Sequence, residues 1–233
     1  MNILKLFLYS LFAASCLSLV LCEKAVITAQ GAAATGEGGK VATMPEQCRL
    51  GKTSTETIGW RWKPGTQVKV YYLKGNFSEA EAGAFSRAIT NWNQALREIN
   101  SQIVFVISGE RESVATNDAS LTVLRGIPRV TKRVGETRFH ALSNGVVRLT
   151  VTINPVVTDL SALQSLLTHE LGHSLGLADC YKCRRGTTAM SAFKSNNQGN
   201  DVYEPSACDK YVVAAGYADD SNAQARLVAL EQR

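Results

Sequence analysis

The sequence predicts an α+β fold in which helices pack against a twisted mixed β-sheet of about five strands. Three observations lead to this prediction. Residues 67–107 read as a strand, a helix and a strand, an order that favours a parallel pair joined by a helical crossover. Residues 137–153 read as two strands around Asn144-Gly145, a dipeptide typical of a hairpin turn and hence of an antiparallel pair. Two further helical segments follow these strands.

The first three elements have the clearest patterns. In Gln67–Leu73, the positions 68, 70 and 72 (Val, Val, Tyr) alternate with the positions 69 and 71 (Lys, Tyr), as expected of a strand. Ser78–Ile99 is predicted to be a helix that begins with a capping box of Ser78 and Glu81. Ile103–Ile107 is a continuous apolar run and is expected in the interior of the sheet. The apolar face of the helix consists of Phe85, Ala88, Ile89, Trp92, Leu96 and Ile99.

Shorter strands follow in the middle of the chain. Gly109–Asp118 is polar and predicts a loop, and Ser120–Leu124 predicts a third strand. Thr137–Leu142 and Val146–Ile153 predict the two arms of the hairpin.

Two more helices are expected after the hairpin. Ser161 with Gln164 predicts the cap of a helix that contains residues 169 to 173. Pro205 predicts the first turn of a last helix, which runs to about Tyr217.

The ends of the chain predict export and one folded domain. Met1–Cys22 reads as a secretory signal, because Lys5 precedes the apolar run Leu6–Leu21. Glu23–Gln47 is rich in Ala, Gly and Thr without an apolar period, so we expect a flexible leader or a pro-segment. Residues 48–233 form the predicted domain, and no second apolar segment predicts a stable membrane association.

Charge and cysteine content narrow the class of protein further. The chain has a formal net charge of +5 and no long Lys/Arg run, so nucleic-acid binding is not expected. We also expect a monomer.

The cysteines predict disulfides. With the signal removed, four cysteines remain: Cys48, Cys180, Cys183 and Cys208. An even number in a secreted chain suggests disulfides, and four cysteines allow three connectivities. We favour a short Cys180–Cys183 bridge together with Cys48–Cys208.

The most specific stretch is residues 169–179, which read H-E-x-x-H-x-x-G-x-x-D. Positions i and i+4 of a helix share one face, so His169 and His173 can bind the same metal ion. Glu170 lies beside them and can reach a metal-bound water. This pattern is the sequence sign of a zinc hydrolase in which the glutamate is the general base.

The residues after the second histidine predict the rest of the site. Gly176 allows the backbone to leave the helix with a positive φ, so that Asp179 can become a third ligand. Three protein ligands leave a fourth position for water, which separates a catalytic zinc site from a structural one. We therefore expect one catalytic Zn²⁺. Calcium is possible but is not indicated, because no Asp-rich calcium loop is visible.

The extended motif resembles that of the metzincin zinc endopeptidases, whose pattern ends in His and is followed by a methionine-containing turn. Here Asp179 takes the third position, as in snapalysin-like members, and residues 169–177 look like the matrixin helix. Residues 186–191 match the Met-turn, and the resemblance implies that Met190 lies beneath the metal as an apolar floor. Ala192 stands where serralysin-like and astacin-like members have a tyrosine.

The resemblance covers most of residues 60–217 as a pattern and implies a zincin-like fold with an active-site helix, a Met-turn and a C-terminal helix. It implies a secreted zinc-dependent endopeptidase that hydrolyses peptides or proteins, with Glu170 as general base. In this family an antiparallel edge strand binds extended substrate, and the candidate is Thr137–Leu142. Matrixins also use a pro-segment cysteine on the zinc for latency, although for Cys48 we favour a plain disulfide.

One alternative uses the same residues without catalysis. His169, His173, Cys180 and Cys183 could close a structural Cys2His2 zinc site in a secreted binding module. Secretion disfavours free thiolates, and this alternative leaves Glu170 and the residues that follow His173 without a role.

Overall fold

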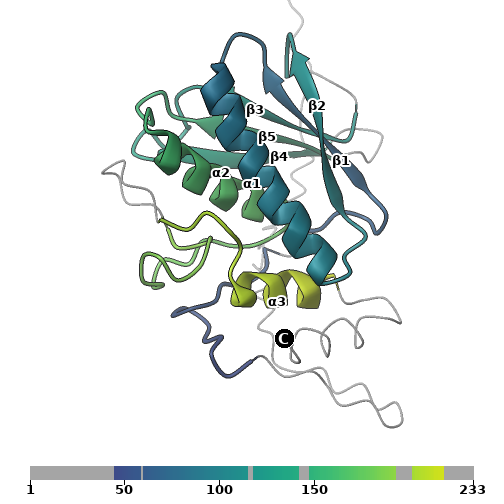
Figure 1. Ribbon diagram of the computed structural model, residues 1–233, viewed down its shortest axis with the longest axis vertical. Helices are drawn as coiled ribbons and strands as arrows, with labels where there is room; N and C mark the ends of the chain where they lie inside the picture. The colour runs from purple at the N-terminus through teal and green to yellow at the C-terminus, as the bar shows by residue number, and fades with distance from the viewer. Residues whose placement is uncertain (1–44, 59, 115–117, 142–146, 193–200, 218–233) are drawn as a thin grey trace, which may run out of the picture. The chain divides into compact units, whose positions relative to one another are not determined.

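The computed structural model describes residues 45–58, 60–114, 118–141, 147–192 and 201–217, which belong to one compact unit. The elements are β1 (Gln67–Leu73), α1 (Glu79–Glu98), β2 (Val104–Arg111), β3 (Ser120–Arg125), β4 (Gly135–Ala141), β5 (Val147–Ile153), α2 (Leu160–Ser174) and α3 (Ala207–Gly216). Figure 1 shows α1 and α2 side by side on one face of the sheet. An ion pair of 2.7 Å between Lys210 of α3 and Glu98 joins α3 to the end of α1.

The five strands form one mixed sheet in the order β2-β1-β3-β5-β4. The pairs β1–β2, β1–β3 and β3–β5 are parallel, whereas β4 and β5 are antiparallel. The predicted α+β class, the parallel pair with a helical crossover and the antiparallel pair are therefore confirmed. Strand β4 forms one edge of the sheet, and its register runs from Gly135 opposite Ile153 to Ala141 opposite Val147.

Strand β2 forms the other edge, and the prediction that it lies in the sheet interior is wrong. Phe105 is buried, but Val106 and Ile107 are 38% and 41% exposed. An apolar run reports the burial of side chains on the two faces, but it does not tell how many neighbouring strands pair with the backbone. The strand also continues to Arg111, into the first residues of the predicted loop Gly109–Asp118.

The core lies between the sheet and the two long helices. Val70, Leu121 and Leu149 are neighbours across β1, β3 and β5, and all three are fully buried. Trp92 of α1 is also fully buried, and its indole Nε1 donates to the Thr168 carbonyl of α2 at 2.7 Å. Apolar burial of this kind provides most of the stability of such a fold, and the tryptophan bond fixes α2 against α1 directly before residue 169.

The observed N-caps of the helices agree only in part with those predicted from the sequence. The capping box of Ser78 and Glu81 is present at α1. At α2 the cap is Asp159, whose carboxylate accepts from the Ala162 backbone N–H at 2.7 Å, so the predicted cap at Ser161 is wrong. Asp159 has an extended backbone and meets the free N–H groups of the first turn, and Ser161 lies inside that turn.

The last helix also begins later than predicted. Ser206 is the N-cap of α3 and forms a capping box with Asp209. Pro205 therefore precedes the cap instead of opening the first turn, while Tyr217 is the C-cap at the predicted end.

Both favoured disulfides are present in the structure. Cys48 is bonded to Cys208 across 160 residues, and Cys180 is bonded to Cys183. Residues 1–22 and 23–44, which hold the predicted signal and most of the predicted leader, lie outside the described residues, as does the Asn144-Gly145 turn. Among the helices in the described ranges, none combines the length and apolar character needed to cross a bilayer.

Candidate metal centre

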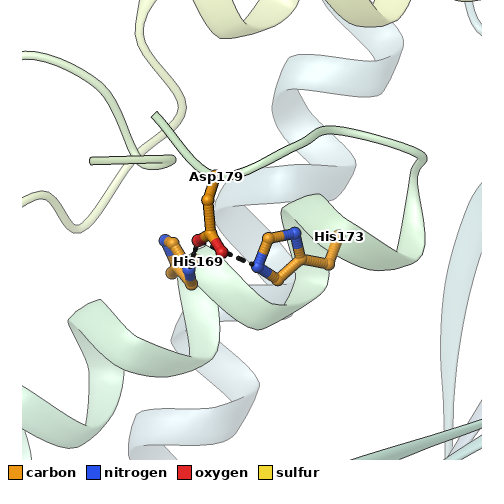
Figure 2. A group of neighbouring side chains, drawn as sticks. All are labelled: His169, His173 and Asp179. Atoms are coloured by element: carbon orange, nitrogen blue, oxygen red, sulfur yellow. Dashed lines mark ion pairs between the residues drawn. The ribbon is translucent and has the colours of Figure 1, made fainter. Parts of the chain in front are cut away.

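Helix α2 and the loop after it bring three potential ligands together (Figure 2). The Nε2 atoms of His169 and His173 lie 3.1 Å and 3.4 Å from Oδ1 of Asp179. Two ligand atoms about 2.0 Å from a tetrahedral zinc ion lie about 3.3 Å from each other. The described residues could therefore hold a metal ion, and two nitrogens with one carboxylate oxygen are donors that suit zinc.

Backbone carbonyls fix the orientation of both imidazole rings. Nδ1 of His169 lies 2.8 Å from the Ala189 carbonyl oxygen, and Nδ1 of His173 lies 2.8 Å from the Leu177 carbonyl oxygen. When each Nδ1–H donates to a carbonyl in this way, Nε2 is the ring nitrogen that remains available to bind a metal ion at the centre of the cluster. Bonds of this type set the tautomer and raise the basicity of a histidine ligand.

Gly176 lets the chain turn from the helix toward Asp179. Its φ is +89°, and a Cβ atom there would lie 2.1 Å from the Trp60 carbonyl oxygen. The turn is held from outside by the segment that precedes Trp60: Ile58 N–H donates to the Gly176 carbonyl at 2.7 Å, and Ala178 N–H donates to the Glu56 carbonyl at 2.8 Å. The turn thus requires glycine for its conformation and for space.

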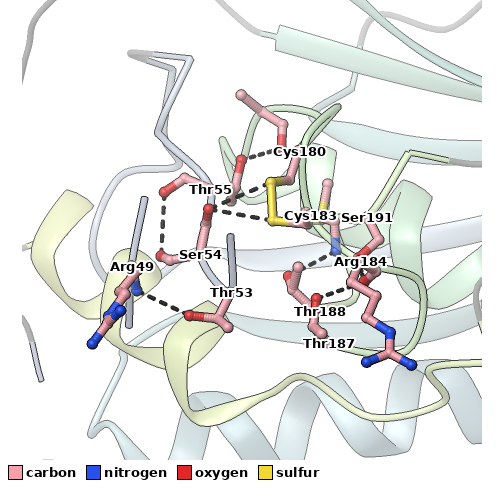
Figure 3. Close-up of a disulfide and its surroundings, with 12 residues drawn as sticks. Arg49, Thr53, Ser54, Thr55, Cys180, Cys183, Arg184, Thr187, Thr188 and Ser191 are labelled. Atoms are coloured by element: carbon pink, nitrogen blue, oxygen red, sulfur yellow. Dashed lines mark hydrogen bonds between the residues drawn. A yellow bond between two sulfur atoms is a disulfide. The ribbon is translucent and has the colours of Figure 1, made fainter. Parts of the chain in front are cut away.

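A disulfide and the turn at residues 186–191 hold the loop beyond Asp179 (Figure 3). The Cys180–Cys183 bridge closes a short loop, and Cys180 N–H donates to the Met190 carbonyl at 2.7 Å. The Ala192 N–H donates back to the Cys180 carbonyl at 3.2 Å. These bonds tie the residue next to Asp179 to the segment that contains the turn.

Met190 packs directly against helix α2. It is fully buried, and a Cβ atom on Gly172 would lie 2.3 Å from its sulfur. Gly172 therefore leaves the space that the methionine fills, one residue before His173. The thioether supplies apolar contact in an irregular gap, a use to which methionine is suited.

A buried carboxylate on α3 supports the same turn. Asp209 is fully buried, and its Oδ2 accepts from the Ala189 backbone N–H at 2.9 Å and from the Ser206 backbone N–H at 2.9 Å. Its Oδ1 accepts from the Thr188 hydroxyl. Since the carbonyl of Ala189 is the one that orients His169, Asp209 is connected to the first histidine through the backbone of a single residue.

Glu170 lies in a cleft beside the cluster. This cleft of about 190 Å³ is lined by residues from α2, the edge strand β4 and the loop beyond α2, among them His169, His173 and Asp179. The Glu170 side chain is buried, and its Oε2 accepts a hydrogen bond from the Thr137 hydroxyl at 2.6 Å. The carboxylate is thus placed between the potential ligands and the edge strand.

The cluster perturbs the protonation of its members. Burial alone would raise the pKa of Asp179, but hydrogen bonds from His169 and His173 and their charges outweigh it and hold that pKa far below its usual value. Burial alone would lower the pKa of His173, but its bond to Asp179 and the negative charges of Glu170 and Asp179 raise it. Without metal, the negative charges around His173 therefore favour its protonated form.

The structure adds three residues that sequence reasoning missed. The Tyr181 hydroxyl donates to Oδ2 of Asp179 at 2.9 Å, which raises the pKa of that phenol. Thr137 and Asp209 reach the centre from other elements. For Asp209 the S-x-x-D capping pattern after Pro205 was a usable signal, whereas nothing in the sequence pairs Thr137 with Glu170.

No protein-family model matches this chain, and a search of curated proteins finds no significant match to it.

Proposed function

We propose that this protein is a secreted, zinc-dependent endopeptidase of the metzincin type. The observation that supports it most is the arrangement of His169, His173 and Asp179 around one point in a cleft, with the Glu170 carboxylate beside them. Three ligands of this kind match a catalytic zinc site, which keeps one position for water. Zinc hydrolases use this combination of two metal-binding histidines and a glutamate on one helix, with the glutamate as the general base.

The roles of the residues follow from their chemistry. When bound, zinc supplies a Lewis acid for the carbonyl and brings the pKa of a bound water to about 7. Glu170 takes the proton of the attacking water and passes it to the amine that leaves. His169, His173 and Asp179 hold the ion, and the carbonyls of Ala189 and Leu177 hold the two imidazoles.

The edge of the sheet fits a peptide substrate. Strand β4 is antiparallel to β5 and has no neighbour on its other side among the described strands. An extended peptide could pair with its free backbone groups, a mode that binds main chain with little regard to sequence. Gly135, Thr137 and Phe139 of this strand line the cleft next to Glu170.

The alternative of a closed Cys2His2 site receives less support. The sulfurs of Cys180 and Cys183 are bonded to each other, so neither is a thiolate ligand. The disulfides also favour an oxidising compartment, in agreement with the signal proposed at residues 1–22.

The proposal is tested with Glu170→Gln beside the wild type. Zinc content by metal analysis should be equal, because Glu170 is not a ligand, and cleavage of a mixed peptide library should fall by about 10²- to 10⁴-fold. Glu79→Gln, in the first turn of α1, is the matched control and should cleave like the wild type. Full cleavage by Glu170→Gln, or none by the zinc-loaded wild type, would contradict the proposal.

A further inference from the structure

The edge strand does more at Glu170 than form a wall of the cleft. Residues 135, 136, 137 and 139 of β4 line the cleft. The hydroxyl of Thr137 lies 2.6 Å from Glu170 Oε2 and 3.2 Å from the Glu170 carbonyl oxygen. The shorter contact is typical of a hydroxyl that donates to a carboxylate, which is the stronger kind of hydrogen bond.

The same strand leaves space for the other carboxylate oxygen. A Cβ atom on Gly135 would lie 2.4 Å from Glu170 Oε1 and 2.8 Å from Leu166 Cδ1. No side chain larger than hydrogen therefore fits at this position while the carboxylate stays where it is. The two positions act together, since Gly135 admits the carboxylate and Thr137 binds it.

A buried carboxylate needs such partners. Glu170 is only 3% exposed, and a buried carboxylate without hydrogen bonds is strongly unfavourable. Within the described part of the chain, the Thr137 hydroxyl is the hydrogen-bond donor to its side chain. Because Thr137 binds Oε2, the Oε1 atom keeps its lone pairs for a proton.

We propose that Thr137 and Gly135 form a cradle on β4 that positions the Glu170 carboxylate for proton transfer. The inference rests on the proposed function, in which Glu170 is the general base. Thr137 is a positioning residue, because it acts through Glu170 and touches neither substrate nor metal in this role. Small misplacements of a catalytic group reduce turnover far more than they reduce binding.

The test compares Thr137→Val, which removes the hydroxyl and keeps the β-branched shape, with Thr137→Ser, which restores it. In the zinc-loaded protein, Thr137→Val should lower kcat by about 10- to 100-fold, with KM and zinc affinity unchanged, and Thr137→Ser should recover most of the loss. Thr150→Val is the matched control. Thr150 lies on β5, and its hydroxyl is 3.4 Å from His140 Nε2, so this variant should keep the wild-type kcat.

A second readout does not depend on activity. In zinc-free protein labelled with ¹³C at glutamate side-chain carboxyls, the resonance of Glu170 is identified by its loss in Glu170→Gln. It should shift in Thr137→Val, return in Thr137→Ser and stay in place in Thr150→Val. An unshifted resonance, a wild-type kcat, or a loss of zinc in Thr137→Val would each overturn the inference.

The two proposals fail in different ways. A wild-type protein that cleaves no peptide, while the resonance shifts as expected, would remove the proposed function and leave the Thr137–Glu170 contact established. A wild-type protein that cleaves peptides, with Thr137→Val equally active, would remove the cradle and leave the function.

Discussion

The two histidines lie one turn apart on the same helix, yet they are held in different ways. His173 is oriented by the carbonyl of Leu177, four residues later in the chain. His169 is oriented by the carbonyl of Ala189, which lies in the turn at residues 186–191 and whose own N–H donates to Asp209 of α3. The side chains also differ in exposure, which is 16% for His173 and 5% for His169.

The orienting carbonyl of His173 is close to it in the sequence, whereas that of His169 is remote. The carbonyl that orients His173 lies in the turn at the end of its own helix, and residues 56–58 bind this turn through backbone hydrogen bonds. His169 requires that α3 be docked, and α3 is joined to the N-terminal part of the domain by the Cys48–Cys208 bridge. Metal affinity should therefore respond to changes far from the ligands on one side of the centre, and to changes in the turn on the other.

The largest effect is expected when the remote support is removed by Asp209→Asn. The amide has one acceptor oxygen where the carboxylate accepts from Thr188, Ala189 and Ser206. We expect a loss of about 4 kcal/mol in the free energy of unfolding, because hydrogen bonds to a buried charge are lost. Zinc affinity should fall by about 10- to 100-fold, as for other residues that orient ligands.

Urea unfolding and competitive zinc titration measure these two quantities. Asp201→Asn is the control. Asp201 forms an exposed ion pair with Arg185, and its positive φ is a backbone conformation that Asn also adopts. Equal zinc affinity in Asp209→Asn and wild type would show that His169 does not depend on α3.

A smaller effect is expected when the local support is changed by Gly176→Ala. The new Cβ would meet the Trp60 carbonyl oxygen, and the positive φ adds strain. Together these should lower the free energy of unfolding by about 3 kcal/mol and weaken zinc binding through the displaced Leu177 carbonyl.

Gly109→Ala separates the two causes. Gly109 has a φ of +87°, close to that of Gly176, but an added Cβ meets nothing within 4 Å. This control should lose about 1 kcal/mol, the strain alone, and keep its zinc affinity. If the two variants were equally destabilised, the contact with Trp60 would not matter to the turn.

The same division between local and remote explains what the sequence could predict. The capping box of α1, the glycine turn and the three potential ligands all lie in short stretches whose spacing has direct physical meaning. The edge position of β2 and the partners Thr137 and Asp209 depend on which distant segments meet. The cap at Asp159 was missed for a different reason: Asp159 and Ser161, two residues apart, are both suitable cap residues, and the extended backbone at Asp159 decides between them.

The smallest effect is the pH dependence of the metal-free protein, and it concerns His173. The raised pKa of His173 means that its contribution to stability is fully present below 6.5 and is lost as the pH rises through its folded pKa. The lowered pKa of Asp179 gives a contribution that is present above 3.8 and is lost as the pH falls. The chelator-treated protein should therefore become less stable as the pH rises from 6.5 through the raised pKa of His173.

Zinc affinity should change in the opposite direction over this range, because the metal takes the place of the proton on Nε2. Urea unfolding with chelator and zinc titration at the same pH values give both curves. His173→Gln should remove most of the slope in the stability of the metal-free protein, since the glutamine does not titrate. A metal-free protein that gains stability across this range would mean that the charge of His173 does not stabilise the cluster, and that only the carbonyl of Leu177 holds the second histidine in place.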